Sequence, residues 1–140
     1  MHATPAAALP ATLTLTAWHD PLVEALGFGP RSPYVEGVWA GVLGPSAILC
    51  YRRLGPFVEL GLDDLDIDVV DLAVSLGLGE GTGRHAAITR TITRLVAFDV
   101  ARWMPDGRYA LRRALAPLPE ARARRLSLSA RLFHDAQTRP

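Results

Sequence analysis

The chain has 140 residues, of which 49% are hydrophobic, and this is enough for one domain with a real core. Its apolar stretches are interrupted well before the roughly 18 residues that a membrane-spanning helix needs, so a soluble protein is expected. The start lacks the basic and apolar regions of a secretory signal, which favours a cytoplasmic location. Cys50 is the only cysteine, which excludes an internal disulfide, and it is expected to be a small buried hydrophobe rather than a nucleophile.

Charge is distributed unevenly along the chain. Residues 1–81 hold three Arg against ten Asp and Glu, whereas residues 82–140 hold twelve Arg against four. This asymmetry indicates either an anionic partner for the second half or attraction between the two halves. The basic residues are all Arg, a bias that a GC-rich genome also produces, so arginine by itself does not identify a phosphate-binding protein.

The composition predicts three segments. Residues 1–17 are rich in Ala, Pro and Thr and are expected to form a flexible N-terminal tail, although TLTLTAW alternates in a way that also permits a short edge strand. Residues 18–117 are predicted to form the main domain. Residues 118–140 are predicted to be a helical extension that dimerises or caps it.

The first half of the domain is predicted to be mainly helical. A short helix is expected between Asp20 as N-cap and Gly27 as stop, with Leu22, Val23 and Leu26 burying one face. Two linked helices follow. Ser32 caps the first of them, and Gly44-Pro45 ends it and starts the second, which is expected to run to about Leu54.

The acidic segment after these helices is predicted to contain a loop, a brief strand at Ile67–Val69 and a helix over Val70–Leu76. Its aspartates at 64, 66 and 68 are spaced like the start of a calcium loop. The sixth position, however, is Val69 instead of Gly and the twelfth is Ser75 instead of Glu. An exposed acidic stretch is therefore favoured over a calcium site.

Glycines occur at every second position in SLGLGEGTGRHAAI, which raises the possibility of a phosphate-binding loop. The chain contains no lysine, so a Walker-type loop is excluded, and the glycines do not have the spacing of a dinucleotide-binding fingerprint. The glycines are instead expected to let the chain reverse between two helices and to bring the N-terminus of the second one close to a phosphate.

The most periodic segment follows these glycines and predicts a helix over about Arg84–Phe98. Ile88, Ile92, Leu95 and Val96 share the spacing of one buried stripe. Arg90 lies almost opposite this stripe at 100° per residue, flanked by Ala86, Thr93 and Arg94, with Thr89 on the shoulder. One side of this helix is therefore expected to be core and the other a cationic, hydroxyl-bearing face.

A β-hairpin is predicted after this helix, with strands near Val100–Met104 and Arg108–Arg112 on either side of Pro-Asp-Gly. Trp103 and Tyr109 are expected to pack across the two strands rather than to stack on bases. One or two helices are then predicted over Glu120–Gln137. Their candidate apolar faces are Leu128 with Leu132, or Leu126 with Phe133.

The order helix, short strand, helix, turn, helix, hairpin resembles that of winged helix-turn-helix DNA-binding proteins, over roughly residues 33–115. DVVDLAVSLGL, AAITRTITRLVAFDVARW and PDGRYALRR look like the successive helix, recognition helix and wing of bacterial regulators. VLGPSAILCYRRL is similar to the leading helix of the winged domain in some bacterial replication-initiation and primosomal proteins. The turn GLGEGTG is longer than the usual three or four residues, which leaves the angle between its helices open.

The fold class expected is therefore α+β, mainly helical with a small hairpin. The function implied is binding of double-stranded DNA by a nucleoid-associated transcriptional regulator, with a homodimer formed through the C-terminal segment. The predicted DNA-binding residues are Arg84, His85, Thr89, Arg90, Thr93, Arg94, Arg102, Arg108 and Arg112.

An alternative stays open, in which the same fold is a protein-interaction module. Enzymatic activity is not expected, because the chain has no Gly-x-Ser-x-Gly elbow, His-Glu-x-x-His pair or cysteine pair. No cofactor is expected, and the four histidines are too scattered to indicate a metal site.

Overall fold

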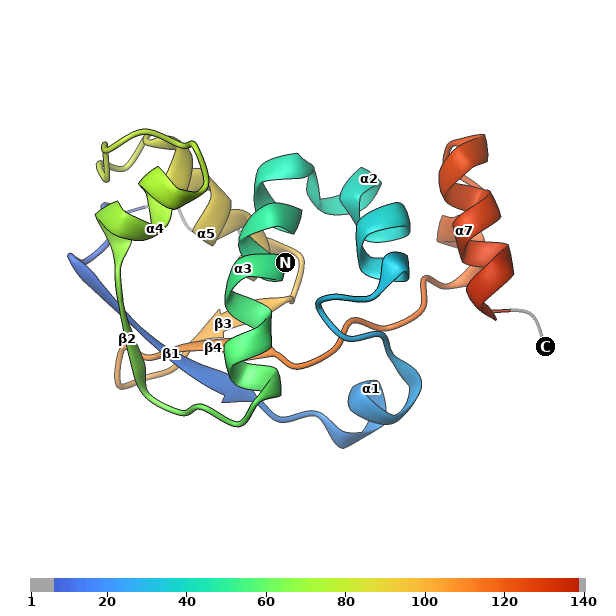
Figure 1. Cartoon of the computed structure of the whole chain (residues 1–140), viewed down its shortest axis with the longest axis horizontal. Coiled ribbons are helices and arrows are strands. Elements are labelled where there is room, and N and C mark those ends of the chain that lie inside the picture. The colour runs from blue at the N-terminus through green and yellow to red at the C-terminus, as the bar shows by residue number, and fades with distance from the viewer. Residues whose placement is uncertain (1–6, 139–140) are drawn as a thin grey trace.

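A computed structural model describes residues 7–138, which form an α+β fold built on a four-stranded mixed sheet (Figure 1). The strands are β1 (Thr12–Trp18), β2 (Leu65–Asp68), β3 (Ala101–Trp103) and β4 (Tyr109–Arg112). Their order in the sheet is β2-β1-β4-β3. β1 is antiparallel to β2 and parallel to β4, and β3 and β4 form the predicted antiparallel hairpin.

The N-terminal strand corrects the expectation of a flexible tail over residues 1–17. Residues 12–18 form β1, which is hydrogen-bonded on both sides and is therefore an interior strand and not an edge strand. Leu13 and Leu15 are buried on the core side, and Thr16 is buried as well. The alternation was thus a correct signal for a strand, and burial of its leucines explains why the segment is ordered. Residues 1–6 of the expected tail lie outside the described residues.

Helices supply the rest of the fold. They are α1 (Pro21–Leu26), a π-helical turn η1 (Val35–Trp39) continuing into α2 (Ala40–Leu43), α3 (Pro45–Glu59), α4 (Val69–Ser75), α5 (Ala87–Ala97), α6 (Glu120–Ala123) and α7 (Leu128–Thr138). α3 lies across the sheet in Figure 1, and α4 and α5 lie at one end of it. Within the described part of the chain, no helix is both long enough and apolar enough to cross a membrane.

The longest helix, α3, extends beyond the end predicted near Leu54. It begins at the Gly44-Pro45 junction as expected and continues through Pro56 to Glu59. Val58 in this added turn is fully buried, and Gly55 lies so close to Pro30 that a Cβ there would be 2.4 Å from its Cγ. Packing therefore outweighs the helix-breaking tendency of proline here.

The larger of two core clusters joins α3, α4 and α5 to the sheet, and a smaller one contains Tyr34, Val38 and Leu118. The largest fully buried side chains of the larger cluster include Tyr51, Leu54, Ile92, Leu95 and Tyr109. The predicted cross-strand pair is present, with the rings of Trp103 and Tyr109 4.8 Å apart in an edge-to-face arrangement. Cys50 is buried as expected, and burial raises the pKa of its thiol to about 12.

Helix α1 is held by charges rather than by its apolar residues. Asp20 caps its N-terminus as predicted, but Leu22 and Leu26 are 69% and 64% exposed, so the expected buried face is absent. Asp20 instead pairs with Arg112 at 2.8 Å, and Glu24 pairs with Arg113 at 3.0 Å. Both pairs join the acidic first half of the chain to the basic second half, which was one of the two predicted consequences of the charge asymmetry.

The C-terminal segment forms two helices, of which α7 packs on η1. The Phe133 ring lies on Gly37, where an added Cβ would come within 2.6 Å of it. His134 is buried and its Nδ1 is 2.8 Å from the Tyr34 hydroxyl. Of the two predicted apolar faces, Leu128 with Leu132 is wrong because both leucines are exposed. The alternative face is the one that packs, with Leu126 half-buried against the Tyr34 cluster and Phe133 on Gly37.

Candidate functional site

Helix α5 is the element on which the predicted site depends. It spans Ala87–Ala97, and so begins three residues after the predicted start at Arg84. Ile88, Ile92 and Leu95 are buried as expected. Their burial against α3 and the sheet fixes the rotation of the helix and therefore decides which side chains face solvent.

The glycine-rich segment forms the connection between α4 and α5. Gly77 and Gly79 have φ values of 74° and 79°, a region that side chains other than glycine seldom adopt. Both are exposed and have nothing within 4 Å of an added Cβ, so backbone conformation rather than crowding requires glycine. These glycines let the chain leave α4 and return to the start of α5, as expected.

Three basic side chains are accessible at and along α5. Arg84 and His85 are exposed in the segment that leads into the helix, and Arg90 is exposed on the side opposite the buried stripe. Among residues 7–138, the Arg84 and Arg90 guanidinium groups make no hydrogen bond or ion pair. Thr93 is half-buried on the same side.

Thr89 does not belong to this surface, and its predicted role is corrected. Its side chain is fully buried, and its hydroxyl donates to the carbonyl oxygen of Gly83 at 2.7 Å. The predicted shoulder position was consistent with exposure, but the glycine-rich connection folds over it. Thr89 therefore anchors this connection to α5 and has no hydroxyl hydrogen to offer to a ligand.

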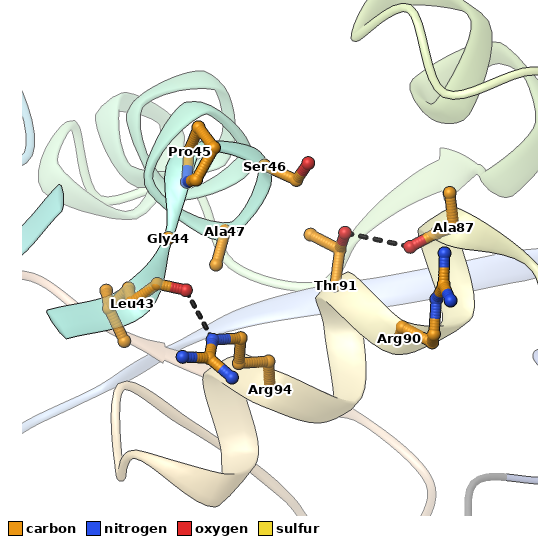
Figure 2. Close-up of a pocket in the computed structure, with 9 residues that line it drawn as sticks. All are labelled: Leu43, Gly44, Pro45, Ser46, Ala47, Ala87, Arg90, Thr91 and Arg94. Atoms are coloured by element: carbon orange, nitrogen blue, oxygen red, sulfur yellow. Dashed lines mark hydrogen bonds between the residues drawn. The ribbon is translucent and has the colours of Figure 1, made fainter. Parts of the chain in front are cut away.

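Arg94 is exposed but held in place. Its guanidinium donates to the carbonyl oxygens of Leu43 and, at 3.2 Å, Val42, and its Cζ lies 4.8 Å from the centre of the Phe98 ring. These carbonyls end α2, where a cation is favourable because helix C-terminal carbonyls lack helical partners. Figure 2 shows Arg94 reaching from α5 to Leu43, with the Gly44–Ala47 segment opposite it.

A cavity of about 220 Å³ separates this segment from α5. It is lined by Leu43, Gly44, Pro45, Ser46, Ala47, Ala87, Arg90, Thr91 and Arg94 (Figure 2). Sequence reasoning placed Arg90 and Arg94 together but did not find this cavity. No local sequence pattern indicates that the start of α3 lies beside α5, because the two segments are about 45 residues apart in the chain.

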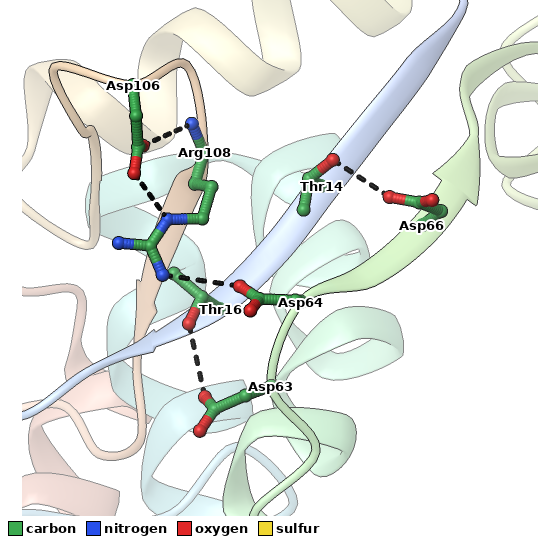
Figure 3. A network of polar contacts seen from close by, with 7 residues as sticks. All are labelled: Thr14, Thr16, Asp63, Asp64, Asp66, Asp106 and Arg108. Carbon is green, nitrogen blue, oxygen red and sulfur yellow. Dashed lines mark hydrogen bonds and ion pairs between the residues drawn. The ribbon is translucent and has the colours of Figure 1, made fainter.

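In the hairpin, Arg108 is neutralised by two aspartates. It bonds Asp106 at 2.9 Å and Asp64 at 3.2 Å, which join the hairpin to the loop before β2 (Figure 3). Hydrogen bonds to these carboxylates, first to Asp64 and then to Asp106, raise the pKa of the Arg108 guanidinium. Arg108 is therefore not a free cation on the hairpin, contrary to its predicted role.

Arg112 is a structural residue for the same reason. Its side chain is 17% exposed, donates to the Asp99 carbonyl and pairs with Asp20, and its Cζ lies 3.7 Å from the centre of the Trp18 ring. The hydrogen bond from Arg112 is the main cause that lowers the pKa of Asp20. Its predicted contact with DNA would require these interactions to break, so Arg112 is removed from the candidate site.

Arg102 is the hairpin arginine that stays accessible. It is exposed on β3, and its Cζ lies 4.5 Å from the centre of the Trp18 ring. Among the described residues, no carboxylate pairs with it. A guanidinium on an aromatic ring is oriented but keeps its hydrogen-bond donors for another partner.

Metal ligation has no candidate within the described residues, where no group of three or more His, Cys, Asp and Glu side chains could hold an ion. The chain matches no protein-family model, no curated protein and no solved structure. The candidate site is therefore defined by geometry alone. It consists of Arg84, His85, Arg90, Thr93, Arg94 and Arg102, with Thr89, Arg108 and Arg112 assigned to the support of the fold.

Proposed function

We propose that the chain binds double-stranded DNA through α5, as a winged helix-turn-helix transcriptional regulator acting at the nucleoid. The order α3, β2, α4, α5, β3, β4 supports this proposal, because it is the order in which a leading helix, a helix-turn-helix and a wing follow one another. The insertion of β1 between β2 and β4 and the long connection before α5 are the features that differ from the simplest form of that arrangement.

The observation that carries the proposal is the unpaired Arg90 on the exposed side of α5. Three other arginines of the second half are used inside the molecule, in pairs with Asp20, Glu24 and Asp64. Arg90 and Arg84 are free of such pairs within residues 7–138, so they can neutralise phosphates or reach base edges without a competing carboxylate.

The hairpin and Arg113, which directly follows it, contribute less to the proposed interface than their four arginines indicate. Arg108, Arg112 and Arg113 are paired with carboxylates, which leaves Arg102 as the hairpin residue for a backbone contact. Fewer phosphate contacts predict a shallower dependence of affinity on salt, since each contact contributes about 0.9 to the slope of log K against log salt.

Self-association of the chain is favoured by one observation on α7. Leu128 and Leu132 are 77% and 61% exposed and lie one turn apart on α7. Exposed leucines at this spacing form a stripe that a partner helix could cover. We propose that a second copy of the chain covers it, giving a homodimer that presents two α5 helices to half-sites about one helical turn apart.

Fluorescence anisotropy with a labelled genomic duplex at two salt concentrations tests the proposal. The wild type is expected to bind, and Arg84→Ala and Arg90→Ala are each expected to lower affinity by about tenfold and to reduce the salt slope by about one. Arg124→Ala is the matched control, because Arg124 is exposed at the far end of the chain in the loop after α6.

DNA binding would be rejected if the wild type failed to bind the duplex at low salt. The assignment to α5 would be rejected if Arg124→Ala weakened binding as much as Arg84→Ala and Arg90→Ala did. Far-ultraviolet circular dichroism on each variant verifies that the fold is intact.

A further inference from the structure

The cavity between α5 and the start of α3 is too small for a drug-sized or nucleotide ligand. Its volume is about 220 Å³, below the roughly 300 to 1,000 Å³ of typical small-molecule sites. It is open to solvent on one side and is lined by small residues on α3 and by arginines on α5 (Figure 2). Its size suits one compact group with a few waters.

The charge of the residues that line the cavity determines whether that compact group is an anion or a cation. Arg90 and Arg94 line the cavity, and none of its lining residues is acidic. Arg94 is held by the Val42 and Leu43 carbonyls, so its guanidinium is already ordered before a ligand arrives. Arg90 has no partner among the described residues, so an anion would not have to displace one. A fixed guanidinium and a free one on the same wall favour an oxyanion.

The opposite wall of the cavity, at the start of α3, adds hydrogen-bond donors that also favour an anion. Gly44 is the N-cap residue of α3 but has no side chain that could cap the helix. Pro45, at the first helical position, has no backbone N–H. The next two backbone N–H groups, of Ser46 and Ala47, have no acceptor within the helix, because the first four amides of any helix lack one. Both residues line the cavity with the arginines, and the Ser46 hydroxyl lies there too (Figure 2).

We propose that this cavity binds one phosphate group, and that in the complex with DNA this is a phosphodiester of the backbone beside the groove that α5 occupies. The inference rests on the proposed function and deepens it, because it fixes which side of α5 lies against the backbone. Arg94 would then position the phosphate, while Arg84 and the outer side of Arg90 remain for other contacts along the duplex.

Ser46→Glu tests the proposal with little risk to the fold. A carboxylate in the first turn of a helix is stabilising, yet here it would place a negative charge where the phosphate binds. Ser129→Glu is the matched control, because Ser129 is exposed at the equivalent second position of α7 and the change in net charge is identical. Thermal unfolding of both variants verifies that each one folds. Arg90→Gln is a second cavity variant, which tests the same site without adding a carboxylate.

Duplex affinity is expected to fall at least tenfold for Ser46→Glu and Arg90→Gln and to change less than twofold for Ser129→Glu. The ¹⁵N amide signals of Ser46 and Ala47 are expected to shift on addition of the duplex, and more weakly with inorganic phosphate alone. If Ser46→Glu binds the duplex as the wild type does while Arg84→Ala does not, the cavity site is wrong and the DNA-binding proposal stands. If inorganic phosphate shifts these amides but no duplex binds, the cavity binds free phosphate and the DNA-binding proposal is wrong.

Discussion

At the scale of single residues, Arg112 illustrates how an arginine that resembles a DNA contact serves the fold. It lies against Trp18, pairs with Asp20 and donates to the Asp99 carbonyl, so it connects β4 with β1, α1 and the end of α5. Its guanidinium provides several donors in a fixed plane, which allows it to join all three at once. Most of the positive charge on the hairpin is thus neutralised by carboxylates of the same molecule.

The Asp20–Arg112 pair predicts a pH dependence of stability. The hydrogen bond from Arg112 lowers the pKa of Asp20 below its ordinary 3.8 in the folded state. A lowered folded-state pKa contributes stability that is present above pH 3.8 and is lost as the pH falls through the lower folded-state value. Asp20→Asn keeps the N-cap of α1, since Asn caps helices as well as Asp does, but removes the ionised partner.

Urea unfolding of Asp20→Asn is therefore expected to show lower stability than the wild type at pH 7, and a gap that narrows as the pH falls below 3.8. Glu80→Gln is the control, because Glu80 is exposed in the connection before α5. A gap between Asp20→Asn and the wild type that stays constant from pH 7 to pH 2 would show that the pair contributes nothing through its charge.

At the scale of elements, α7 is attached by one buried polar junction. The Tyr34 hydroxyl accepts from the Leu118 N–H at 2.8 Å and shares a second hydrogen bond, also of 2.8 Å, with His134 Nδ1. Tyr34 is fully buried and its ring stacks on Phe28 with centroids 4.0 Å apart. The hydroxyl therefore links η1, the segment before α6, and α7 at a buried position, where each hydrogen bond that is lost is costly.

Tyr34→Phe is expected to destabilise the protein by about 1–3 kcal/mol, because the Leu118 N–H and His134 Nδ1 lose their partner in the interior. Hydrogen exchange should accelerate in α7 beyond the rest of the molecule. Tyr51→Phe is the matched control, since the Tyr51 hydroxyl is also buried but donates to the Arg112 carbonyl, away from α7. Equal acceleration of α7 in both variants would contradict the role given to Tyr34.

Local patterns predicted the elements more successfully than their contacts. The stripe on α5, the Asp20 cap, the hairpin and the Trp103–Tyr109 pair are short-range features, and each is present. The central position of β1 was missed because an alternating strand has the same pattern whether it lies at an edge or inside a sheet. The burial of Thr89 and the pairing of Arg108 were missed because both depend on which loop lies above them.

At the scale of the whole molecule, the uneven charge is divided between two roles. Three ion pairs join Asp20, Glu24 and Asp64 of the first half to arginines of the second half. Among residues 82–138, the exposed arginines without a carboxylate partner lie in and before α5, on β3 and around α6, where Arg122, Arg124 and Arg125 are exposed. The molecule thus keeps a cationic surface although its net charge is only +1.

The proposed homodimer belongs to this scale as well. Sedimentation equilibrium at micromolar concentration is expected to give twice the 15.1 kDa chain mass for the wild type and the chain mass for a Leu128→Glu, Leu132→Glu variant. Leu22→Glu, Leu26→Glu is the control, because these leucines are equally exposed on α1. A monomeric wild type would remove the dimer from the proposal and leave single-site binding.

The exposed side of α5 is the proposed contact surface for DNA. Amide chemical shifts of the ¹⁵N-labelled protein during titration with a duplex measure which residues contact it. We expect the largest shifts within residues 84–94, with smaller groups at Ser46 and Ala47 and at the hairpin around Arg102, and we expect all of them to diminish as salt is raised. Shifts confined to α7 and the acidic segment before α4, or no shifts at low salt, would contradict the assignment of this surface to DNA.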